Sequence, residues 1–304
     1  MGDGTALDRA ASILGELAER DVPIGPMTTY RVGGVAALFV RAESEADLAA
    51  AREAVAATNL PVLVVGKGSN LLVADRGFHG LAIALGEGFA GIELLDGRLV
   101  RAGGAVSLPV LARRTAAAGL TGFEWAVGVP GSVGGAVRMN AGGHGSDMSE
   151  SLVSARVVDL AGRRDASVPA RDLALGYRTS NIAPSEVVSW AELQLAAGDK
   201  AASEAQIAEI VRWRREHQPG GQNAGSIFTN PPGGSAGQLI DGCGLKGFQV
   251  GSAFVSPKHA NFFQAEEGGS ADDVRALIEQ VRERVEQATG VRLVPELRMV
   301  GFES

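Results

Sequence analysis

The segment Trp125–Gly145, WAVGVPGSVGGAVRMNAGGHG, decides the fold of this chain. Seven of its 21 residues are glycine, and none is Lys, Asp or Glu. Glycine lets backbone amides approach a ligand closely and adopt positive φ, but it is entropically costly to order, so an apolar segment this rich in glycine is a poor packing element. Consecutive amides in such conformations form concavities that bind anions. The segment therefore predicts a cradle for a large cofactor that carries phosphate groups.

A second glycine loop lies upstream, at Gly66–Asn70 (GKGSN), directly after the short apolar run Leu60–Val65, which is typical of a strand. The loop lacks the GxxxxGK[ST] spacing of a P-loop, and Leu71 stands where a GxGxxG dinucleotide motif has its third glycine. Alone, such a loop is more often an ordinary turn. Two glycine loops that match neither common nucleotide fold favour a different kind of pyrophosphate-binding site.

Composition limits the class of protein. The chain has 304 residues, enough for two or three compact units, and its 45% hydrophobic and 21% charged residues are ordinary for a globular protein. A net charge of −7 without a basic block argues against nucleic-acid binding. The N-terminus does not resemble a signal peptide, and no run of 18 apolar residues predicts a membrane span. We expect a cytoplasmic protein without membrane contact.

Cysteine and histidine usage gives no indication of a metal site. Cys243 is the single cysteine, so an intrachain disulfide is excluded. The four histidines are scattered without ligand spacing: His79, His144, His217 and His259.

Hydrophobic periodicity predicts the elements and a division of the chain. Helices are expected at 7–20, 44–59, 107–118, 203–217 and 270–288, and strands at 62–65, 81–85, 91–95, 98–102, 153–159, 164–168, 187–195 and 291–300. Ser44 and Ser203 are expected to cap the helices that begin at them. Asp199–Ser203 has the composition of a linker, so a second unit is expected from about 197 to 304.

Two polar motifs lie outside the glycine loops. Arg178, in Tyr177–Ser180 (YRTS), offers five donors in a planar fork that suits a carboxylate or another oxyanion, although such a tetrapeptide is more often part of a surface ion pair. Ser226, in Asn223–Pro231 (NAGSIFTNP), follows a glycine as turn residues do. Two large apolar residues come after it, so it is expected at the mouth of a core segment.

Glu296 lies in the alternating segment 291–300. Leu293, Leu297 and Met299 share one face of the expected strand, so Glu296 is expected on the other face. By itself, a glutamate in this position would be solvated or salt-bridged.

Taken together, motifs along the chain resemble the ordered signature of the UDP-N-acetylenolpyruvoylglucosamine reductase family. They lie between about residues 24 and 301: Thr29–Gly34, Gly66–Asn70, Val129–Gly135, Asn140–Gly142, Tyr177–Ser180, Gly225–Pro231, Ala236–Ile240, Gly244–Gly247, Val255–Phe262 and Pro295–Glu296. The resemblance implies an α+β fold with a two-lobed FAD-binding domain of the vanillyl-alcohol-oxidase type, at 1–85 and 86–196. It also implies a smaller α/β substrate-binding domain at 197–304, whose final strand returns toward the active site.

The resemblance further implies an activity: NADPH-dependent reduction of an enolpyruvyl UDP-sugar to UDP-N-acetylmuramate, an early cytoplasmic step of peptidoglycan synthesis. Hydride from the flavin adds to the vinyl carbon, and negative charge spreads into the neighbouring carboxylate. Arg178 is expected to stabilise this charge, as is Glu296 if its pKa is raised enough to keep it protonated. Ser226 is expected to donate the final proton.

The resemblance also assigns binding residues. Non-covalent FAD is expected at Arg31, Gly66, Lys67, Gly68, Ser69, Asn70, Val129, Pro130, Gly131, Ser132, Gly134, Gly135, Asn140 and Gly142. The UDP-sugar is expected at Tyr177, Asn230, Lys246, Lys258 and His259. The chain is expected to be a monomer.

Two departures from the family pattern bear on the substrate. Only about a dozen residues separate Ser180 from the strand ending at Leu195, so the chain is similar to the shorter branch, which lacks a tyrosine loop over the substrate. Thr229 replaces the usual lysine before Asn230, which leaves Arg214, Lys246 and Lys258 as candidates for the diphosphate.

Two alternatives remain open at this point. An FAD-dependent sugar or alcohol oxidase of the same cofactor fold often tethers its flavin through a histidine, and His144 lies in a glycine loop. A non-catalytic nucleotide-binding module would hold no flavin and turn over no NADPH.

Overall fold

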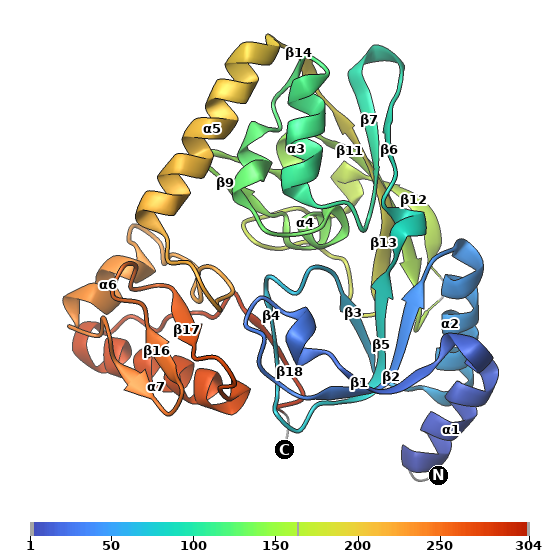
Figure 1. Ribbon diagram of the computed structural model, residues 1–304, viewed down its shortest axis with the longest axis horizontal. Coiled ribbons are helices and arrows are strands. Elements are labelled where there is room, and N and C mark those ends of the chain that lie inside the picture. Colours follow the sequence, from blue (N-terminus) through green and yellow to red (C-terminus); the bar gives the residue numbers. More distant parts are fainter. Residues whose placement is uncertain (1–2, 163, 303–304) are drawn as a thin grey trace. The chain divides into compact units, whose positions relative to one another are not determined.

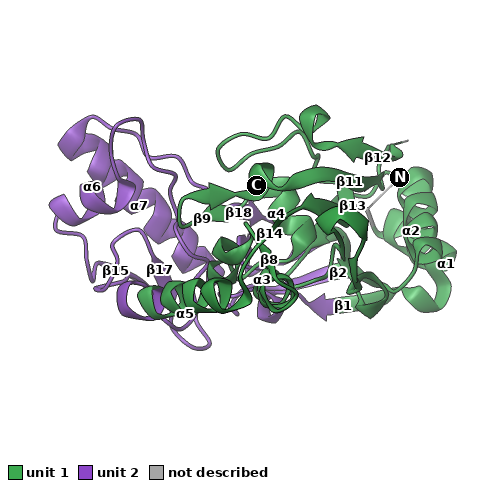
Figure 2. Ribbon diagram, turned by 90° about the horizontal axis from the view of Figure 1, so that it is seen from above, with its two compact units in different colours: residues 1–21, 37–67, 79–213 green, residues 22–36, 68–78, 214–304 purple. Residues whose placement is uncertain are grey.

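The chain forms two compact units, and each contains segments distant in the sequence (Figures 1 and 2). The computed structural model describes residues 3–162 and 164–302. Unit 1 comprises Met1–Asp21, Ala37–Lys67 and His79–Trp213, and unit 2 comprises Val22–Ala36, Gly68–Phe78 and Arg214–Ser304. The boundaries expected from the sequence, at 85/86 and 196/197, remain a prediction.

Unit 1 is built on two sheets with helices packed on them. Its helices are α1 (Asp3–Leu14), α2 (Glu45–Thr58), α3 (Leu108–Ala117), α4 (Val133–Met139) and most of α5 (Lys200–His217). Its strands, of which β1, β2 and β5 run across a boundary between the units, are β1 (Glu19–Pro23), β2 (Val35–Ala42), β3 (Val62–Val65), β5 (Phe78–Leu85), β6 (Ile92–Leu94), β7 (Leu99–Gly103), β8 (Leu120–Thr121), β9 (Gly142–Gly143), β10 (Ser146–Asp147), β11 (Leu152–Asp159), β12 (Asp165–Pro169), β13 (Glu186–Gln194) and β14 (Ala196–Ala197).

The first sheet of unit 1 has the strand order β1-β2-β5-β3, with β3 and β5 parallel. Helices α1 and α2 lie together (Figure 1) and share a hydrophobic core with these strands. Helix α2 begins where the sequence predicts, because Ser44 accepts from the Asp47 amide and Asp47 accepts from the Ser44 amide.

The second sheet of unit 1 has the strand order β12-β11-β13-β7-β6, all antiparallel. The predicted hairpin of β11 and β12 is confirmed. Helices α3 and α4 cover one side of this sheet, and α4 lies on β13 and β7 (Figure 1). A separate hydrophobic core contains buried residues of both helices and of the sheet. The described residues of unit 1 therefore form two cores, and the core under α1 and α2 also takes in Val158 of β11 and Val187 of β13.

Unit 2 has one hydrophobic core. Its elements are α6 (Ala236–Gly242), α7 (Ala271–Thr289), the sheet β15 (Gln249–Val250), β16 (Ala253–Val255) and β17 (Phe263–Ala265), and the parallel pair β4 (Leu71–Val73) and β18 (Arg298–Val300). The predicted apolar stripe of α7 is confirmed: Val274, Leu277, Ile278, Val281 and Val285 are fully buried. Tyr30, from the early motif Thr29–Gly34, belongs to the same core, and its hydroxyl donates to the Phe263 carbonyl at 3.1 Å.

Two helices begin elsewhere than the sequence indicates. The first helix is α1, followed by a 3₁₀ turn and strand β1, rather than one helix over 7–20. Helix α5 begins at Lys200, where the Asp199 carboxylate accepts from the Ala202 amide. The linker at 199–203 and the Ser203 cap were therefore wrong, because Ser203 is buried inside α5 and its hydroxyl donates to the Glu124 carboxylate.

The last expected strand is also shorter than predicted. Only Arg298–Val300 forms a strand, parallel to β4, instead of 291–300. Pro295 has no N–H to offer to a continuous ladder, and it makes an isolated bridge with Phe228.

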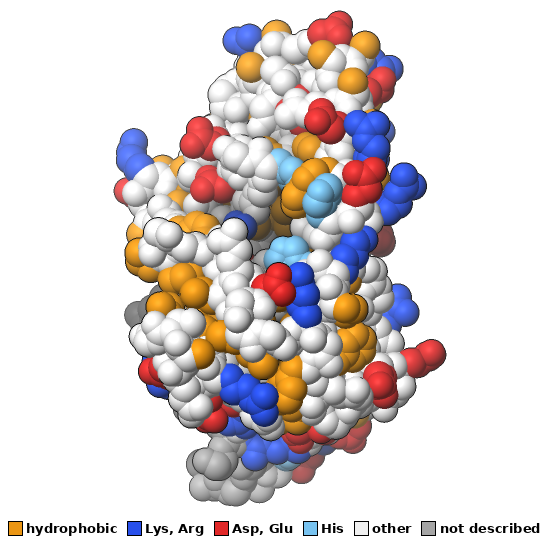
Figure 3. Space-filling view, turned by 90° about the vertical axis from the view of Figure 1, so that its left-hand side faces the viewer, with side chains coloured by type: hydrophobic (Ala, Val, Ile, Leu, Met, Phe, Trp, Pro, Cys, Tyr) orange, Lys and Arg blue, Asp and Glu red, His pale blue; other side chains and the backbone are white. Residues whose placement is uncertain are grey.

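No helix in the described part of the chain is long and apolar enough to cross a membrane. On the face shown in Figure 3, the described Lys and Arg side chains are interspersed with Asp and Glu.

Candidate functional site

The two glycine segments approach each other in unit 1. Gly66 follows β3, and Ser132 lies just before α4, where its hydroxyl accepts from the Gly135 amide at 3.4 Å. A Cβ atom at Gly66 would lie 2.8 Å from the Ser132 hydroxyl oxygen. The first glycine loop and the start of α4 therefore lie within van der Waals distance at Gly66, and a side chain there would displace the Ser132 hydroxyl.

The second glycine segment is not one continuous loop, because it contains a 3₁₀ helix (Glu124–Gly128) and α4. Its glycines serve different purposes. A Cβ at Gly134 would lie 3.0 Å from the Val188 carbonyl oxygen, so this glycine lets α4 pack on β13. Gly135 is exposed, and a Cβ there would meet only the Ser132 hydroxyl, at 3.5 Å. Gly135 therefore leaves its backbone open to a ligand.

Arg178 is held against the end of the same glycine segment. Its guanidinium donates to the Gly142 carbonyl at 2.8 Å and lies 5.4 Å from the ring centroid of Tyr177, which is exposed. Arg178 has φ +56°, which is unusual for a residue with a Cβ. Asn140, the C-cap of α4, also has a positive φ, +39°.

In unit 2, the backbone brings Ser226, Glu296 and Asn70 to neighbouring segments. The Glu296 amide donates to the Ile227 carbonyl at 2.8 Å, and the Asn70 side-chain amide donates to the Glu296 carbonyl at 3.1 Å. Ser226 pairs with Phe262 in an isolated bridge. Both Ser226 and Glu296 are partly exposed, as side chains that meet a substrate must be.

Asn261 is a residue of this region that the sequence reasoning left without a role. It is 3% exposed, and its side chain makes two hydrogen bonds to the backbone of Phe228. The side-chain oxygen accepts from the Phe228 amide at 3.0 Å, and the side-chain nitrogen donates to the Phe228 carbonyl at 2.8 Å. The sequence does contain a signal for this role, because Asn261 stands between the apolar residues Ala260 and Phe262. An asparagine side chain buried there needs hydrogen-bond partners.

The rest of the first glycine loop lies close to the early motif of unit 2. The Thr29 amide donates to the Gly68 carbonyl at 3.1 Å, and Arg31 is exposed with φ +56°. Lys67 is also exposed, and Ser69 is partly exposed.

Three of the expected substrate residues contact α6 or its first turn. The Asn230 side chain accepts from the Ala236 amide at 3.1 Å, Lys246 forms an ion pair with Asp241 at 2.8 Å, and His259 lies beside Gly237. Burial lowers the pKa of His259, and the charge of Lys246 lowers it further. Of the other two, Lys258 donates to the Arg215 carbonyl at 2.7 Å, and Tyr177 lies beside Arg178.

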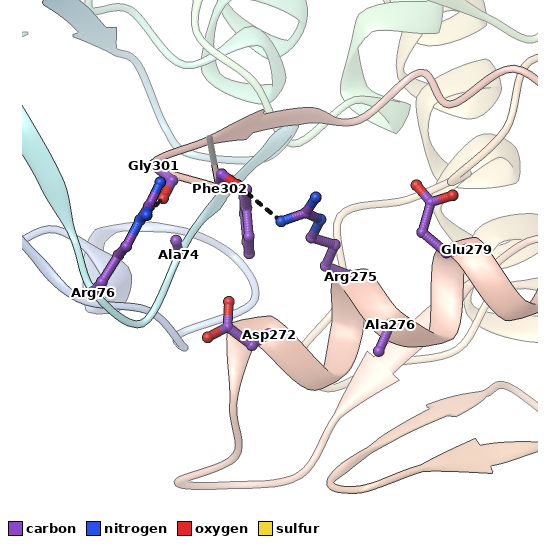
Figure 4. Close-up of a pocket in the computed structure, with 8 residues that line it drawn as sticks. All are labelled: Ala74, Arg76, Asp272, Arg275, Ala276, Glu279, Gly301 and Phe302. Atoms are coloured by element: carbon purple, nitrogen blue, oxygen red, sulfur yellow. Dashed lines mark hydrogen bonds between the residues drawn. The ribbon is translucent and has the colours of Figure 1, made fainter. Parts of the chain in front are cut away.

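A pocket of about 390 Å³ in unit 2 is lined by none of these residues (Figure 4). Its lining includes Arg275, which donates to the Phe302 carbonyl at 3.0 Å, and Arg76, which donates to the Gly301 carbonyl. Because none of the expected site residues lines it, this pocket carries no functional argument. Among the described residues, no cluster of His, Cys, Asp or Glu could hold a metal ion.

Comparison with known proteins identifies the family of this chain. A family model of an FAD-binding domain matches residues 36–164, and a model of the UDP-N-acetylenolpyruvoylglucosamine reductase C-terminal domain matches residues 217–300. A UDP-N-acetylenolpyruvoylglucosamine reductase from Heliobacterium modesticaldum is 44% identical over 282 residues, which are 92% of this chain and 89% of the relative. The chain belongs to the UDP-N-acetylenolpyruvoylglucosamine reductase family.

Further family members cover the chain almost completely. One from Rubrobacter xylanophilus is 40% identical and covers 99% of each chain. The crystal structure of the family member from Thermus caldophilus has a TM-score of 0.81 at 35% identity, and the match covers 93% of this chain and 98% of that one. The α+β fold with an FAD-binding domain and the family's C-terminal domain is thereby confirmed.

Proposed function

We propose that this chain is an FAD-dependent oxidoreductase that uses NADPH to reduce the enolpyruvyl group of UDP-N-acetylglucosamine enolpyruvate, giving UDP-N-acetylmuramate. Family membership over nearly the whole chain supports this activity. The structural observation that carries it is the approach of the two glycine segments at Gly66 and Ser132, with Arg178 bonded to the second segment at Gly142.

FAD is proposed to bind non-covalently along the glycine segments. Backbone groups of Gly66–Asn70, Val129–Gly135 and Gly142 would hold it, together with Arg31 and Lys67. Gly135→Val should weaken FAD binding, because its Cβ would occupy space that the protein leaves open. Gly91→Val is the control, since a Cβ at Gly91 meets nothing within 4 Å and Gly91 lies outside the two glycine segments.

Arg178 is proposed to stabilise the negative charge that develops on the substrate. Bound FAD, once reduced by NADPH, supplies the hydride that adds to the vinyl carbon. The adjacent carboxylate then takes up negative charge, and a fixed guanidinium is well suited to bind it because it is planar and permanently charged.

Ser226 is proposed to donate the proton that completes the reaction at the carbon next to the carboxylate. A hydroxyl is a weak acid, but it suffices towards a carbanion within reach. Glu296, on the adjoining backbone segment, is proposed to assist as a second donor.

The UDP part of the substrate is proposed to contact the residues around α6. Lys246 and Lys258 offer positive charge to the diphosphate, while Asn230, His259 and Tyr177 are further contacts. We propose that the protein acts as a monomer in the cytoplasm, in peptidoglycan synthesis, and so supports cell shape and division.

An assay of the wild-type protein tests this function. Protein reconstituted with FAD should consume NADPH only when the enolpyruvyl sugar nucleotide is present, and the product should gain the mass of two hydrogen atoms. Consumption of NADPH without that product, with oxygen as the acceptor, would instead favour an oxidase-like enzyme. A protein that binds no FAD would favour a non-catalytic module.

A further inference from the structure

The turn that carries Arg178 is tight and conformationally unusual. Gly176 and Thr179 exchange backbone hydrogen bonds of 3.0 and 3.2 Å, so Tyr177 and Arg178 form the two central positions. Arg178 has φ +56°. Residues in such sparsely populated regions persist only where the surroundings hold them there, and they cluster at functional sites.

The side chain of Asn140 holds this turn from the end of α4. Its amide nitrogen donates to the Gly176 carbonyl at 3.0 Å and to the Asp147 carboxylate at 3.2 Å. Its carbonyl oxygen accepts from the Ser149 amide at 2.9 Å. An asparagine side chain has two N–H donors, so both are used within the protein, and Asn140 is only 2% exposed.

Two further bonds tie the same turn to the same end of α4. The Ser180 hydroxyl donates to the Arg138 carbonyl at 2.6 Å, and the Arg178 guanidinium donates to the Gly142 carbonyl at 2.8 Å. The turn is thus fixed before, at and after Arg178 to residues 138–142. These residues are the last two of α4, its C-cap Asn140 and the two that follow.

We propose that Asn140 is a positioning residue for Arg178, and not a side chain that binds the cofactor. It fixes the carbonyl of Gly176, which also accepts the Thr179 amide that closes the turn. The inference rests on the proposed function, because it assigns Asn140 to the step in which Arg178 meets the substrate carboxylate. Loss of this link should displace the guanidinium, and a displacement of about 1 Å can slow a reaction about 10²-fold.

Two substitutions of Asn140 test the proposal. Asn140→Gly removes the side chain and keeps the left-handed backbone accessible, whereas Asn140→Asp keeps the shape and removes both donors. Both variants should bind FAD and be reduced by NADPH as the wild type is. Reoxidation of the reduced protein by the enolpyruvyl substrate should slow about 10²-fold. The matched control is Asn181→Asp, because the Asn181 amide also donates to a backbone carbonyl, that of Asp172 at 2.8 Å, but on the exposed surface.

A double variant and a structural readout exclude a merely structural role. In the Arg178→Ala background, Asn140→Gly should slow reoxidation no further, since its effect passes through Arg178. In the protein without FAD, amide exchange at Gly176–Ser180 should accelerate in Asn140→Gly and not in Asn181→Asp.

Three outcomes would overturn the inference. In the first, Asn140→Gly weakens FAD binding but is reoxidised at the normal rate when FAD is saturating. In the second, Asn140→Gly slows reoxidation as much in the Arg178→Ala background as in the wild type. In the third, amide exchange at Gly176–Ser180 is the same in Asn140→Gly as in the wild type. Failure of the wild-type protein itself to be reoxidised by the substrate would instead overturn the proposed function, and the proposed role of Asn140 with it.

Discussion

Two buried asparagines, Asn140 in unit 1 and Asn261 in unit 2, fix the segments that carry the proposed catalytic residues. They are 2% and 3% exposed, respectively. Asn140 joins the end of α4 to a turn 36 residues away along the chain. Asn261 instead pairs with both backbone groups of a single residue, Phe228, two positions after Ser226.

The two asparagines differ because the proposed catalytic side chains that they position, Arg178 and Ser226, differ in length. Arg178 is long, loses much rotamer entropy when it is fixed, and lies at a central position of its turn, between the two residues that pair. Ser226 is short, so its hydroxyl goes where the backbone goes, and the backbone there is paired: the Ile227 amide donates to the Asn261 carbonyl at 2.9 Å. The unit 1 asparagine should therefore affect one reaction step, whereas the unit 2 asparagine should affect stability.

The largest effect is expected for Ser226→Ala. FAD binding and reduction by NADPH should be retained, because the serine acts only on the substrate. Net reduction should fall by about 10²–10⁴, the usual contribution of a positioned acid. Rapid-mixing measurements of the two half-reactions separate these steps. Wild-type rates of substrate reduction would show that the proton comes from elsewhere, such as water or Glu296.

Arg178→Ala should have the next largest effect. The reaction with the substrate should slow by about 10²–10³, as for loss of one oxyanion donor. Arg178→Lys should recover only part of this, because the planar fork is lost. Equal losses in the NADPH and substrate half-reactions would instead assign Arg178 to the cofactor or to the fold.

Asn261→Ala should act mainly on stability. It leaves the amide and the carbonyl of Phe228, which is 1% exposed, without partners. Each buried group left unsatisfied costs about 1–3 kcal/mol. Urea unfolding should show this loss, and Asn140→Gly measured in parallel should lose less stability and more activity. The reverse order would contradict the comparison between the two asparagines.

The smallest effect is expected at Glu124, which is not among the proposed site residues. Burial by itself raises its pKa, but hydrogen bonds from Ser203, Thr121 and the Gly122 amide outweigh it, so the pKa is lowered in the folded state. A lowered pKa stabilises the fold above the unfolded value of about 4.3, and this contribution is lost as the pH falls through the folded value. The free energy of unfolding of Glu124→Gln should therefore fall less than that of the wild type as the pH is lowered from above about 4.3 through the folded pKa of Glu124. Urea unfolding at a series of pH values measures this difference.

Local signals in the sequence predicted much of the fold. The cap at Ser44, the stripe of α7 and the hairpin β11–β12 depend on residues close in sequence, and all three are confirmed. Ser203 was wrongly made a cap, because its partner Glu124 lies 79 residues away. Nor did periodicity show that residues 22–36 and 68–78 fold with the C-terminal region.

The candidate site shows the same limit. The motifs identified the residue types that the chemistry needs, including Arg178 and Ser226. They could not show that the Asn140 amide bonds to Gly176, or that Asn70 donates to the Glu296 carbonyl 226 residues away. Such bonds depend on tertiary structure, and no spacing along the chain reports them.

The most direct test of the proposed function is the second half-reaction of the wild-type protein. The FAD-loaded protein is reduced with NADPH under anaerobic conditions and mixed with one equivalent of UDP-N-acetylglucosamine enolpyruvate. The account predicts that the yellow colour returns at a rate fast enough to support turnover, with one equivalent of UDP-N-acetylmuramate formed. Flavin that stays reduced with this substrate and is reoxidised only by oxygen would contradict it.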